Sequence, residues 1–269
     1  MKRKTKKKKE KPKNNYHRQS KLIIMHVYIY DDYLNKSKYN KAINRTEIRL
    51  TDLGLNGKII RLGGIKNIKG TIQNEIKLGA KTIIAVGNNQ TVNKIIGAII
   101  DTDVYGGFQK KTLLGLIPIG ADNSIAASFG IKNEEEACNI LLARRIEKID
   151  LGLVNNHYFL NQATIQSLGT ILEVDDYSLE ITERGEAKII NLLSDPKEKI
   201  KSNPHDGLLE VLVRTRKKDQ TLLTVKKIKI TNPENKLIID GVLEINTPAE
   251  ITVMRDKVNV IVGKDRLFE

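Results

Sequence analysis

A short polar segment between an apolar strand and a helix is the part of this sequence best suited to chemistry. Residues 83–86 read Ile-Ile-Ala-Val, residues 87–90 read Gly-Asn-Asn-Gln, and a helical apolar pattern begins at Val92. In an open α/β sheet, ligands bind beyond the carboxyl end of a strand and at a helix N-terminus, where free backbone N–H groups attract anions. The segment therefore has the position of a phosphate-binding loop.

The residue types in this loop fit phosphate binding better than catalysis. Gly87 and Asn88 tolerate the backbone conformations that such a loop needs, and Asn89 and Asn93 could donate hydrogen bonds to phosphate. A carboxamide cannot act as a base or give a metal ion a negative charge. The alternative interpretation is a tight strand–helix turn in which Thr91 caps the helix.

A second loop has the same setting. Residues 117–124 read Ile-Pro-Ile-Gly-Ala-Asp-Asn-Ser, follow an apolar strand and precede a helical stretch at 125–129. Gly120 and Asn123 are its candidate binding residues. Two such loops at one edge of a sheet would form a single crevice, so their joint occurrence is a stronger indication than either loop alone.

The elements that must position these loops alternate between strand and helix through residues 22–149. Apolar runs predict strands at 22–30, 58–62, 82–86 and 112–117. Helical periodicity, with capping residues and terminal charges, predicts helices at 35–53, 68–79, 92–100 and 133–148. Such alternation is typical of an α/β fold with a mostly parallel sheet and helices on both faces.

After residue 150 the pattern becomes all-β. Asn155 and Asn156 mark a hairpin between 150–154 and 157–160. Further strands, separated by turn signals, are predicted at 171–174, 177–182, 187–192, 208–215, 222–231, 236–239, 250–254 and 257–262. We therefore expect an N-terminal α/β domain at 22–149 and a C-terminal β-sandwich domain at 150–269.

The net charge of +14 is concentrated in an N-terminal tail. Residues 1–21 hold eleven Lys and Arg and one Glu, whereas the rest of the chain carries 35 basic and 31 acidic residues. Such a block of like charges predicts disorder. It could simply be a solvating tail, or it could bind an anionic membrane surface or, without sequence specificity, nucleic acid.

The amino-acid composition indicates the cellular compartment in which the protein is expected. The single cysteine, Cys138, excludes an internal disulfide, which fits a cytoplasmic protein, and it falls on an apolar helix stripe as a core thiol would. No apolar run approaches the ~20 residues of a membrane span. We expect a cytoplasmic protein, with peripheral membrane attachment through the tail as an alternative.

The order of these segments resembles the diacylglycerol kinase catalytic-domain family, which includes bacterial lipid kinases and sphingosine kinases. The family's Gly-Gly-Asp-Gly-Thr-(Val/Ile)-Asn-Glu motif corresponds to residues 87–94, and its Ile-Pro-Leu-Gly-Thr-Gly-Asn-Asp motif to residues 117–124. Weaker matches follow in consistent order at 128–131, 149–152, 158–161, 203–210, 236–242 and 247–248. The resemblance spans residues 22–263 and implies a fold like that of NAD kinases and diacylglycerol kinases.

The departures from the family pattern bear on activity. The family's metal-handling and nucleotide-handling Asp corresponds to Asn89, and its proposed base, the Glu of an Asp-Gly-Glu motif, corresponds to Val242. Asp240 remains from that motif, and Glu244 lies two residues beyond Val242, so on a strand it could point to the same side as a shifted base. In place of Asn-Pro-x-Ser-Gly after the first strand, residues 31–34 read Asp-Asp-Tyr-Leu.

The resemblance implies an ATP-type nucleotide held by residues 87–91, Asn93, Gly120 and Asn123, with Mg²⁺ as cofactor if the protein is active. Asp206 matches a segment linked to a structural Mg²⁺ in bacterial relatives. Because several acidic groups are replaced together, we expect a divergent lipid-kinase-family protein that is weakly active or a pseudokinase. The alternatives are an active ATP-dependent lipid kinase with a shifted base, and an adaptor for nucleic acid or anionic membranes acting through the tail.

Overall fold

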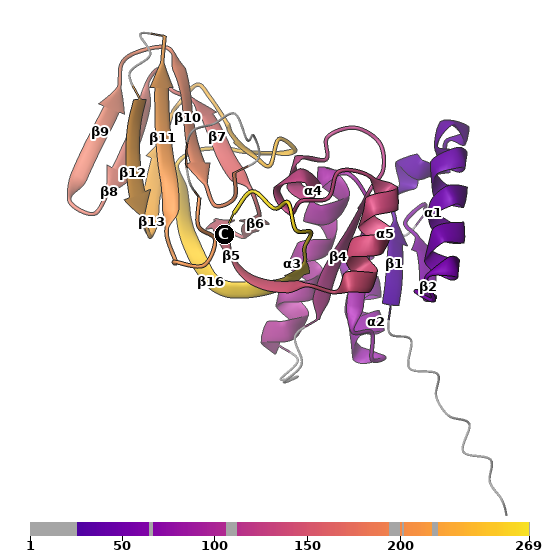
Figure 1. Ribbon diagram of the computed structural model, residues 1–269. Coiled ribbons are helices and arrows are strands. Elements are labelled where there is room, and N and C mark those ends of the chain that lie inside the picture. Colours follow the sequence, from indigo (N-terminus) through magenta and orange to yellow (C-terminus); the bar gives the residue numbers. More distant parts are fainter. Residues whose placement is uncertain are drawn as a thin grey trace, which may run out of the picture.

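A computed structural model gives the fold of this chain and describes residues 26–64, 67–105, 112–193, 200, 202–216 and 220–268. Figure 1 shows two lobes, one with helices around a sheet and the other built of strands, joined by the long strands β5 and β16. The tail at 1–21 and residues 22–25 of the first predicted strand lie outside the described residues.

The first lobe is a parallel sheet covered by helices. Its strands pair in the order β2-β1-β3-β4, and the bounds are β1 (His26–Tyr30), β2 (Lys58–Arg61), β3 (Thr82–Gly87) and β4 (Leu113–Pro118). Every residue of β1, β3 and β4 is buried, which requires cover on both faces of the sheet. Helices α1 (Asn40–Asp52) and α5 (Glu134–Ala143) pack together, as do α2 (Ile68–Lys77) and α3 (Asn89–Tyr105).

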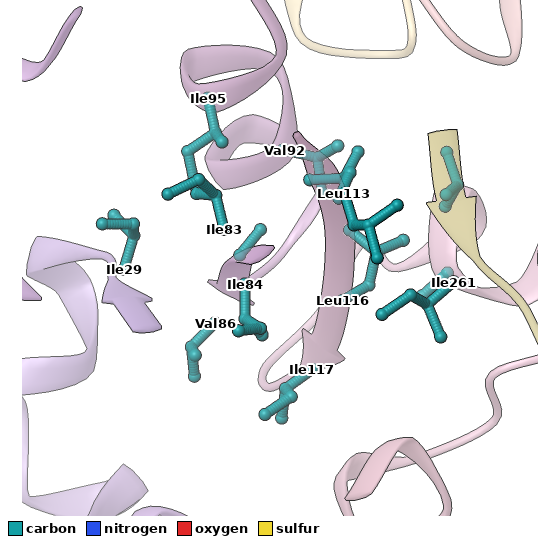
Figure 2. Close-up of a cluster of buried hydrophobic side chains, with 14 of the residues drawn as sticks. Ile29, Ile83, Ile84, Val86, Val92, Ile95, Leu113, Leu116, Ile117 and Ile261 are labelled. Atoms are coloured by element: carbon teal, nitrogen blue, oxygen red, sulfur yellow. The ribbon is translucent and has the colours of Figure 1, made fainter. Parts of the chain in front are cut away.

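Shorter helices shape the loops of this lobe. Two 3₁₀ turns, η1 (Asp32–Asn35) and η2 (Ser37–Tyr39), follow β1, and α4 (Ser124–Ser128) follows the loop after β4. The core is mainly aliphatic, as the low aromatic content of 4% predicts. Figure 2 shows Ile83 and Ile84 of β3 packed among residues of neighbouring elements.

The second lobe is a β-sandwich. Its strands are β5 (Ile146–Val154), β6 (His157–Phe159), β7 (Gln162–Gln166), β8 (Thr170–Val174), β9 (Tyr177–Ile181), β10 (Gly185–Ile190), β11 (Leu209–Thr215), β12 (Gln220–Val225), β13 (Lys227–Thr231), β14 (Leu237–Ile239), β15 (Leu243–Ile245) and β16 (Ala249–Ile261). One sheet has the order β12-β11-β10-β7-β14-β15, and the other contains β16, β13, β8 and β9. Buried side chains from both sheets form one core, so the predicted fold class is confirmed.

Strand β16 connects the two lobes. Its first half pairs with β13 and β5, and near its end Asn259 and Val260 pair in parallel with β4. Ile261, seen beside Leu113 and Leu116 in Figure 2, joins the core of the first lobe. The last residues of the chain thus return to the α/β lobe, and the division between residues 149 and 150 stays a prediction.

Several predicted element boundaries were wrong. The helix expected to reach residue 148 ends at Ala143, because Arg144 is left-handed and β5 begins at Ile146. The helix expected at 35–53 starts only at Asn40. The predicted strand at 222–231 is two strands, the predicted strands at 250–254 and 257–262 are one, and β7 and β15 were not predicted.

Two remaining observations concern the whole described chain. No helix in the described ranges is long and apolar enough to cross a membrane. Cys138 is fully buried, as expected for a core thiol, and burial raises its pKa to about 11.

Candidate functional site

A cleft of about 430 Å³ lies where the loops of the α/β lobe face the sandwich. Its lining residues are Asn88, Asn89, Gln90, Asp122, Ser124, Asn161, Gln162, Asp240, Gly241 and Val242. We call it the main cleft. Both predicted loops and the Asp240 turn, which are far apart in the sequence, therefore meet at one place. A second cleft of about 450 Å³, lined partly by Asn93 and Lys94, lies between α3 and the β5–β6 hairpin.

The first loop makes a sharp passage from β3 into α3. Gly87 has a φ of +156°, and a Cβ there would come within 2.1 Å of the Thr91 hydroxyl oxygen. Only glycine fits this close approach. Helix α3 starts at Asn89, so Thr91 lies inside the helix, and its interpretation as the N-cap was wrong. The Asn88 side chain accepts from the Thr91 backbone N–H at 3.3 Å.

Asn89 joins the two loops. Its side-chain amide donates to the Ser124 hydroxyl at 2.8 Å, and its side-chain oxygen accepts the Ile125 backbone N–H at 3.0 Å. Its own backbone N–H donates to the Asp122 carbonyl at 2.9 Å. Asn89 is 5 % exposed. Both ends of its carboxamide hold the crevice together, whereas Gln90 is exposed on the cleft wall.

Thr91 faces a buried charge behind the loop. Its hydroxyl donates to the Asp31 carboxylate at 2.8 Å, and Lys94 Nζ lies 2.9 Å from the same oxygen. Asp31 is 3 % exposed. The residue that replaces the family's Glu, Lys94, thus forms an ion pair with the residue that replaces the Asn after the first strand. Thr91 is therefore turned away from the main cleft toward this pair.

The second loop has a tight backbone covered by a tyrosine. Gly120 has a φ of +97°, and a Cβ there would meet the Tyr33 ring at 3.3 Å. The Tyr33 hydroxyl donates to the Ile119 carbonyl, and burial followed by nearby Asp31 raises the tyrosine pKa. The Asn123 side chain donates to the Gly120 carbonyl at 2.8 Å. Gly120 and Asn123 thus shape the loop and do not line the main cleft.

Asp122 occupies the position of the second glycine in the family's motif. It keeps a glycine-like φ of +61°. Its carboxylate is exposed on the cleft wall, where the family has no side chain. Asp122 was not predicted as a site residue, because an aspartate in a loop is usually only a turn former.

Asp240 is the buried carboxylate of the main cleft. It accepts three backbone N–H groups, from Leu160 at 3.0 Å, Asn161 at 2.9 Å and Gln162 at 3.0 Å. Burial raises its pKa to about 6, although these donors and the adjacent Asn93 side chain act to lower it. Asp240 is thus a buried carboxyl group whose pKa lies closer to neutral than that of a free aspartate.

Two predicted residues lie apart from the cleft. Glu244 is exposed on β15 and pairs with Lys236 at 2.8 Å, which lowers its pKa. Asp206 accepts the Leu208 backbone N–H at 2.9 Å in a local turn. No group of three or more His, Cys, Asp or Glu able to hold a metal occurs among the described residues. A resident Mg²⁺ does not fit, because the cleft offers mainly amides and the Asp240 oxygens already accept backbone N–H groups.

An α/β lobe with two strand–helix loops facing a β-sandwich is the fold of several solved kinases. A crystal structure of a diacylglycerol kinase from Bacillus anthracis superposes with a TM-score of 0.72 at 16% identity, covering 90% of this chain and 97% of that one. An NAD kinase from Archaeoglobus fulgidus, solved in complex with ATP, superposes with a TM-score of 0.59 at 13% identity, covering 90% and 96%. The fold is therefore the one shared by diacylglycerol kinases and NAD kinases.

Sequence comparison agrees with the fold. Residues 27–154, just under half of the chain, match the model of the diacylglycerol kinase catalytic domain. It is 31% identical over 121 residues to "Probable lipid kinase YegS-like" of Enterobacter sp. (strain 638), covering 43% of this chain and 39% of that protein. It is 32% identical over 83 residues to a diacylglycerol kinase of Bacillus subtilis, covering 30% and 25%. The matched segments thus span less than half of the length of either relative.

Proposed function

We propose that this protein binds an ATP-type nucleotide with its phosphates in the main cleft, and that it transfers the γ-phosphoryl group weakly or not at all. It would then act chiefly as a nucleotide-binding pseudokinase of the lipid-kinase family. The observation that carries the proposal is the meeting of both loops in one cleft with amides where the family has acids.

The nucleotide side rests on the start of α3. This helix is 17 residues long, and its first turn opens at Asn89 and Gln90 on the cleft wall. The backbone N–H groups of Asn89 and Thr91 already donate to the Asp122 carbonyl and the Asn88 side chain, so the attraction for an anion there comes from the helix dipole, at roughly 0.3–1 kcal/mol. The cleft volume lies within the usual range for small-molecule sites, about 300–1,000 Å³.

The expectation that phosphoryl transfer is weak or absent depends on three side chains. Asn89 is neutral and holds Ser124 and Ile125, Val242 has no proton-accepting group, and Ser124 is neutral where the family has an Asp. Phosphoryl transfer depends on positioned phosphates, a metal and a placed nucleophile, and losses among cooperating groups are far from additive.

One observation favours the alternative of an active kinase. Asp240 faces the main cleft with a pKa raised to about 6, which suits a general base near neutral pH. Glu244, the other candidate for a shifted base, lies outside the cleft. An active enzyme would therefore use Asp240 as base, with a lipid-like hydroxyl as acceptor and Mg²⁺ arriving with the nucleotide.

The adaptor alternative rests on residues 1–21 alone, which lie outside the described residues. Deleting them tests it. If the full chain binds phosphatidylserine vesicles or RNA and the shortened chain does not, the tail is a binding segment. Equal binding by both removes this alternative.

The nucleotide proposal is tested by thermal unfolding with Mg-ATP and Mg-ADP. A hundredfold excess over Kd should raise the Tm by about 5 °C or more. Gln90→Glu should weaken binding by placing a negative charge at the anion site, and the matched Gln90→Lys should strengthen it, since residue 90 is exposed and neither change disturbs packing. If millimolar nucleotide leaves the Tm unchanged, the proposal is wrong. If nucleotide does bind, radiolabelled phosphoryl transfer to extracted lipids distinguishes weak activity from none.

A further inference from the structure

Asn161 is a buried polar side chain that the fold leaves without a partner. It lines the main cleft and is 1 % exposed. Neither its side-chain nitrogen nor its side-chain oxygen has a hydrogen-bond partner within the described part of the chain. Each buried polar atom left unpaired costs roughly 1–3 kcal/mol, so folded proteins keep such atoms where something else pairs with them.

The backbone holds this residue rigidly. Its N–H donates to Asp240, and its carbonyl accepts the backbone N–H groups of Asn191 at 2.8 Å and Leu192 at 3.0 Å. Every backbone polar group of Asn161 is thus engaged, while its carboxamide is free. A side chain presented in this way from a fixed backbone is suited to binding a ligand in one orientation.

The chemistry of the site narrows the ligand. A free carboxamide offers one acceptor oxygen and two N–H donors, and Asp240 Oδ2, which accepts one backbone N–H, that of Leu160, keeps a further acceptor position beside it. An alcoholic hydroxyl both donates and accepts, so it can satisfy this set, whereas a phosphate oxygen cannot donate. The tight enclosure of Asn161 also admits a small terminal group more readily than a phosphate.

We propose that the Asn161 carboxamide binds an alcoholic hydroxyl group in the main cleft, next to Asp240. Such a hydroxyl could come from the glycerol of a lipid or from the ribose of a nucleoside. The inference deepens the proposed function, because this hydroxyl would be on the acceptor side of a kinase cleft. It can nevertheless be tested without ATP.

The experiment measures thermal unfolding of the full chain with 1,2-dioctanoylglycerol in mixed micelles in one arm and adenosine in the other. We expect one of the two probes to raise the Tm of the wild type. Asn161→Ala should weaken that binding roughly tenfold, since two neutral hydrogen bonds are lost. Asn161→Ser, which keeps a small polar group, should bind with intermediate affinity.

Asn191→Ala is the matched control. Asn191 is equally buried, but its side-chain amide donates to the Asp150 carbonyl at 3.0 Å and the Leu160 carbonyl at 2.8 Å. Without ligand, Asn191→Ala should lower the Tm by several degrees, whereas Asn161→Ala should leave it unchanged or raise it. The inference is overturned if neither probe shifts the wild type, which would mean that water pairs with Asn161, if Asn161→Ala keeps the shift, or if it destabilises the free protein as much as Asn191→Ala does.

The two proposals fail separately. Loss of the Mg-ATP shift with a retained hydroxyl-ligand shift would overturn the nucleotide proposal and leave the role of Asn161 intact. Loss of the hydroxyl-ligand shift with a retained Mg-ATP shift would overturn the role of Asn161 and leave the nucleotide proposal intact.

Discussion

Lys94 Nζ lies 2.9 Å from a carboxylate oxygen of Asp31, and the two residues are separated by more than sixty positions in the sequence. In the family these positions hold a Glu and an Asn. The ion pair links the residue after β1 to α3, and the Thr91 hydroxyl donates to the same carboxylate.

This pairing makes Lys94→Glu a strongly destabilising change. It removes the cation and places a second carboxylate beside the buried Asp31, which should lower the free energy of unfolding by about 2–4 kcal/mol. Asp31→Asn combined with Lys94→Glu should recover most of the loss, because the new amide can donate to the new carboxylate. Urea unfolding of the two single variants and the double variant checks this, and additive effects within about 0.5 kcal/mol would contradict it.

Asp240 predicts a pH dependence of stability. Its pKa is about 6 in the folded protein and 3.8 as the ordinary value, so folding favours the protonated form. The stabilisation is complete below pH 4, is lost as the pH rises toward 6, and amounts to about 3 kcal/mol at most. Between pH 4 and pH 6, wild type should therefore lose free energy of unfolding relative to Asp240→Asn, which has no titrating group at this position.

That comparison also controls for other titrating groups. Glu210, whose pKa burial raises to about 7, is present in both proteins, so its contribution cancels in the difference. A difference that stays constant across pH 4–6 would mean that Asp240 titrates as it does in water.

Gly87 should tolerate no side chain. In Gly87→Ala, the Cβ would overlap the Thr91 hydroxyl, which holds Asp31, so we expect a loss of about 2–3 kcal/mol together with weaker nucleotide binding. Gly97 is the control, because it lies in α3 with nothing within 4 Å of an added Cβ. Gly97→Ala should raise stability by about 1 kcal/mol. Equal effects of the two variants on unfolding would disprove this geometry.

The sequence pattern was sufficient to place the two loops at one edge of the sheet, whereas Asp240 was expected at the site only through the family resemblance. The four consecutive apolar residues 83–86 indicate a central strand by composition alone. A polar segment that directly follows such a strand in an α/β fold lies at the carboxyl edge of the sheet. Because parallel strands end at one edge, the meeting of the two loops could be predicted before any contact was known.

Glu244 shows where such reasoning fails. The expectation that it shares a side with residue 242 assumed a continuous strand. Asp240 and Gly241 both have positive φ, and the residues form a turn before β15, so strand alternation does not run through them. The Asp31–Lys94 pair and the free carboxamide of Asn161 were missed for another reason: each depends on contacts between distant segments, which no local pattern encodes.

The last prediction concerns the lost acids. In Asn89→Asp, the new carboxylate can accept the Ile125 N–H as the amide oxygen does, and the Ser124 hydroxyl can turn to donate to it. Val242→Glu places a carboxylate at a half-buried position on the wall of the main cleft. Both changes therefore fit the existing fold, and the double variant should transfer phosphate from Mg-ATP to extracted lipids at least tenfold faster than wild type.

The single variants, and a variant with the second acid at another position, show whether both new carboxylates are needed for the gain in phosphoryl transfer. Either single change should give little, since metal handling and proton transfer are both needed. Asn89→Asp with Ile238→Glu, which puts the second acid at an exposed position on β14 outside the main cleft, should stay inactive. If wild type is already as active as the double variant and Asp240→Asn abolishes its activity, then Asp240 is the base and the protein is a working kinase. If Asn89→Ala leaves wild-type activity intact, Asn89 lies outside the catalytic machinery, and the phosphate site must be sought elsewhere in the cleft.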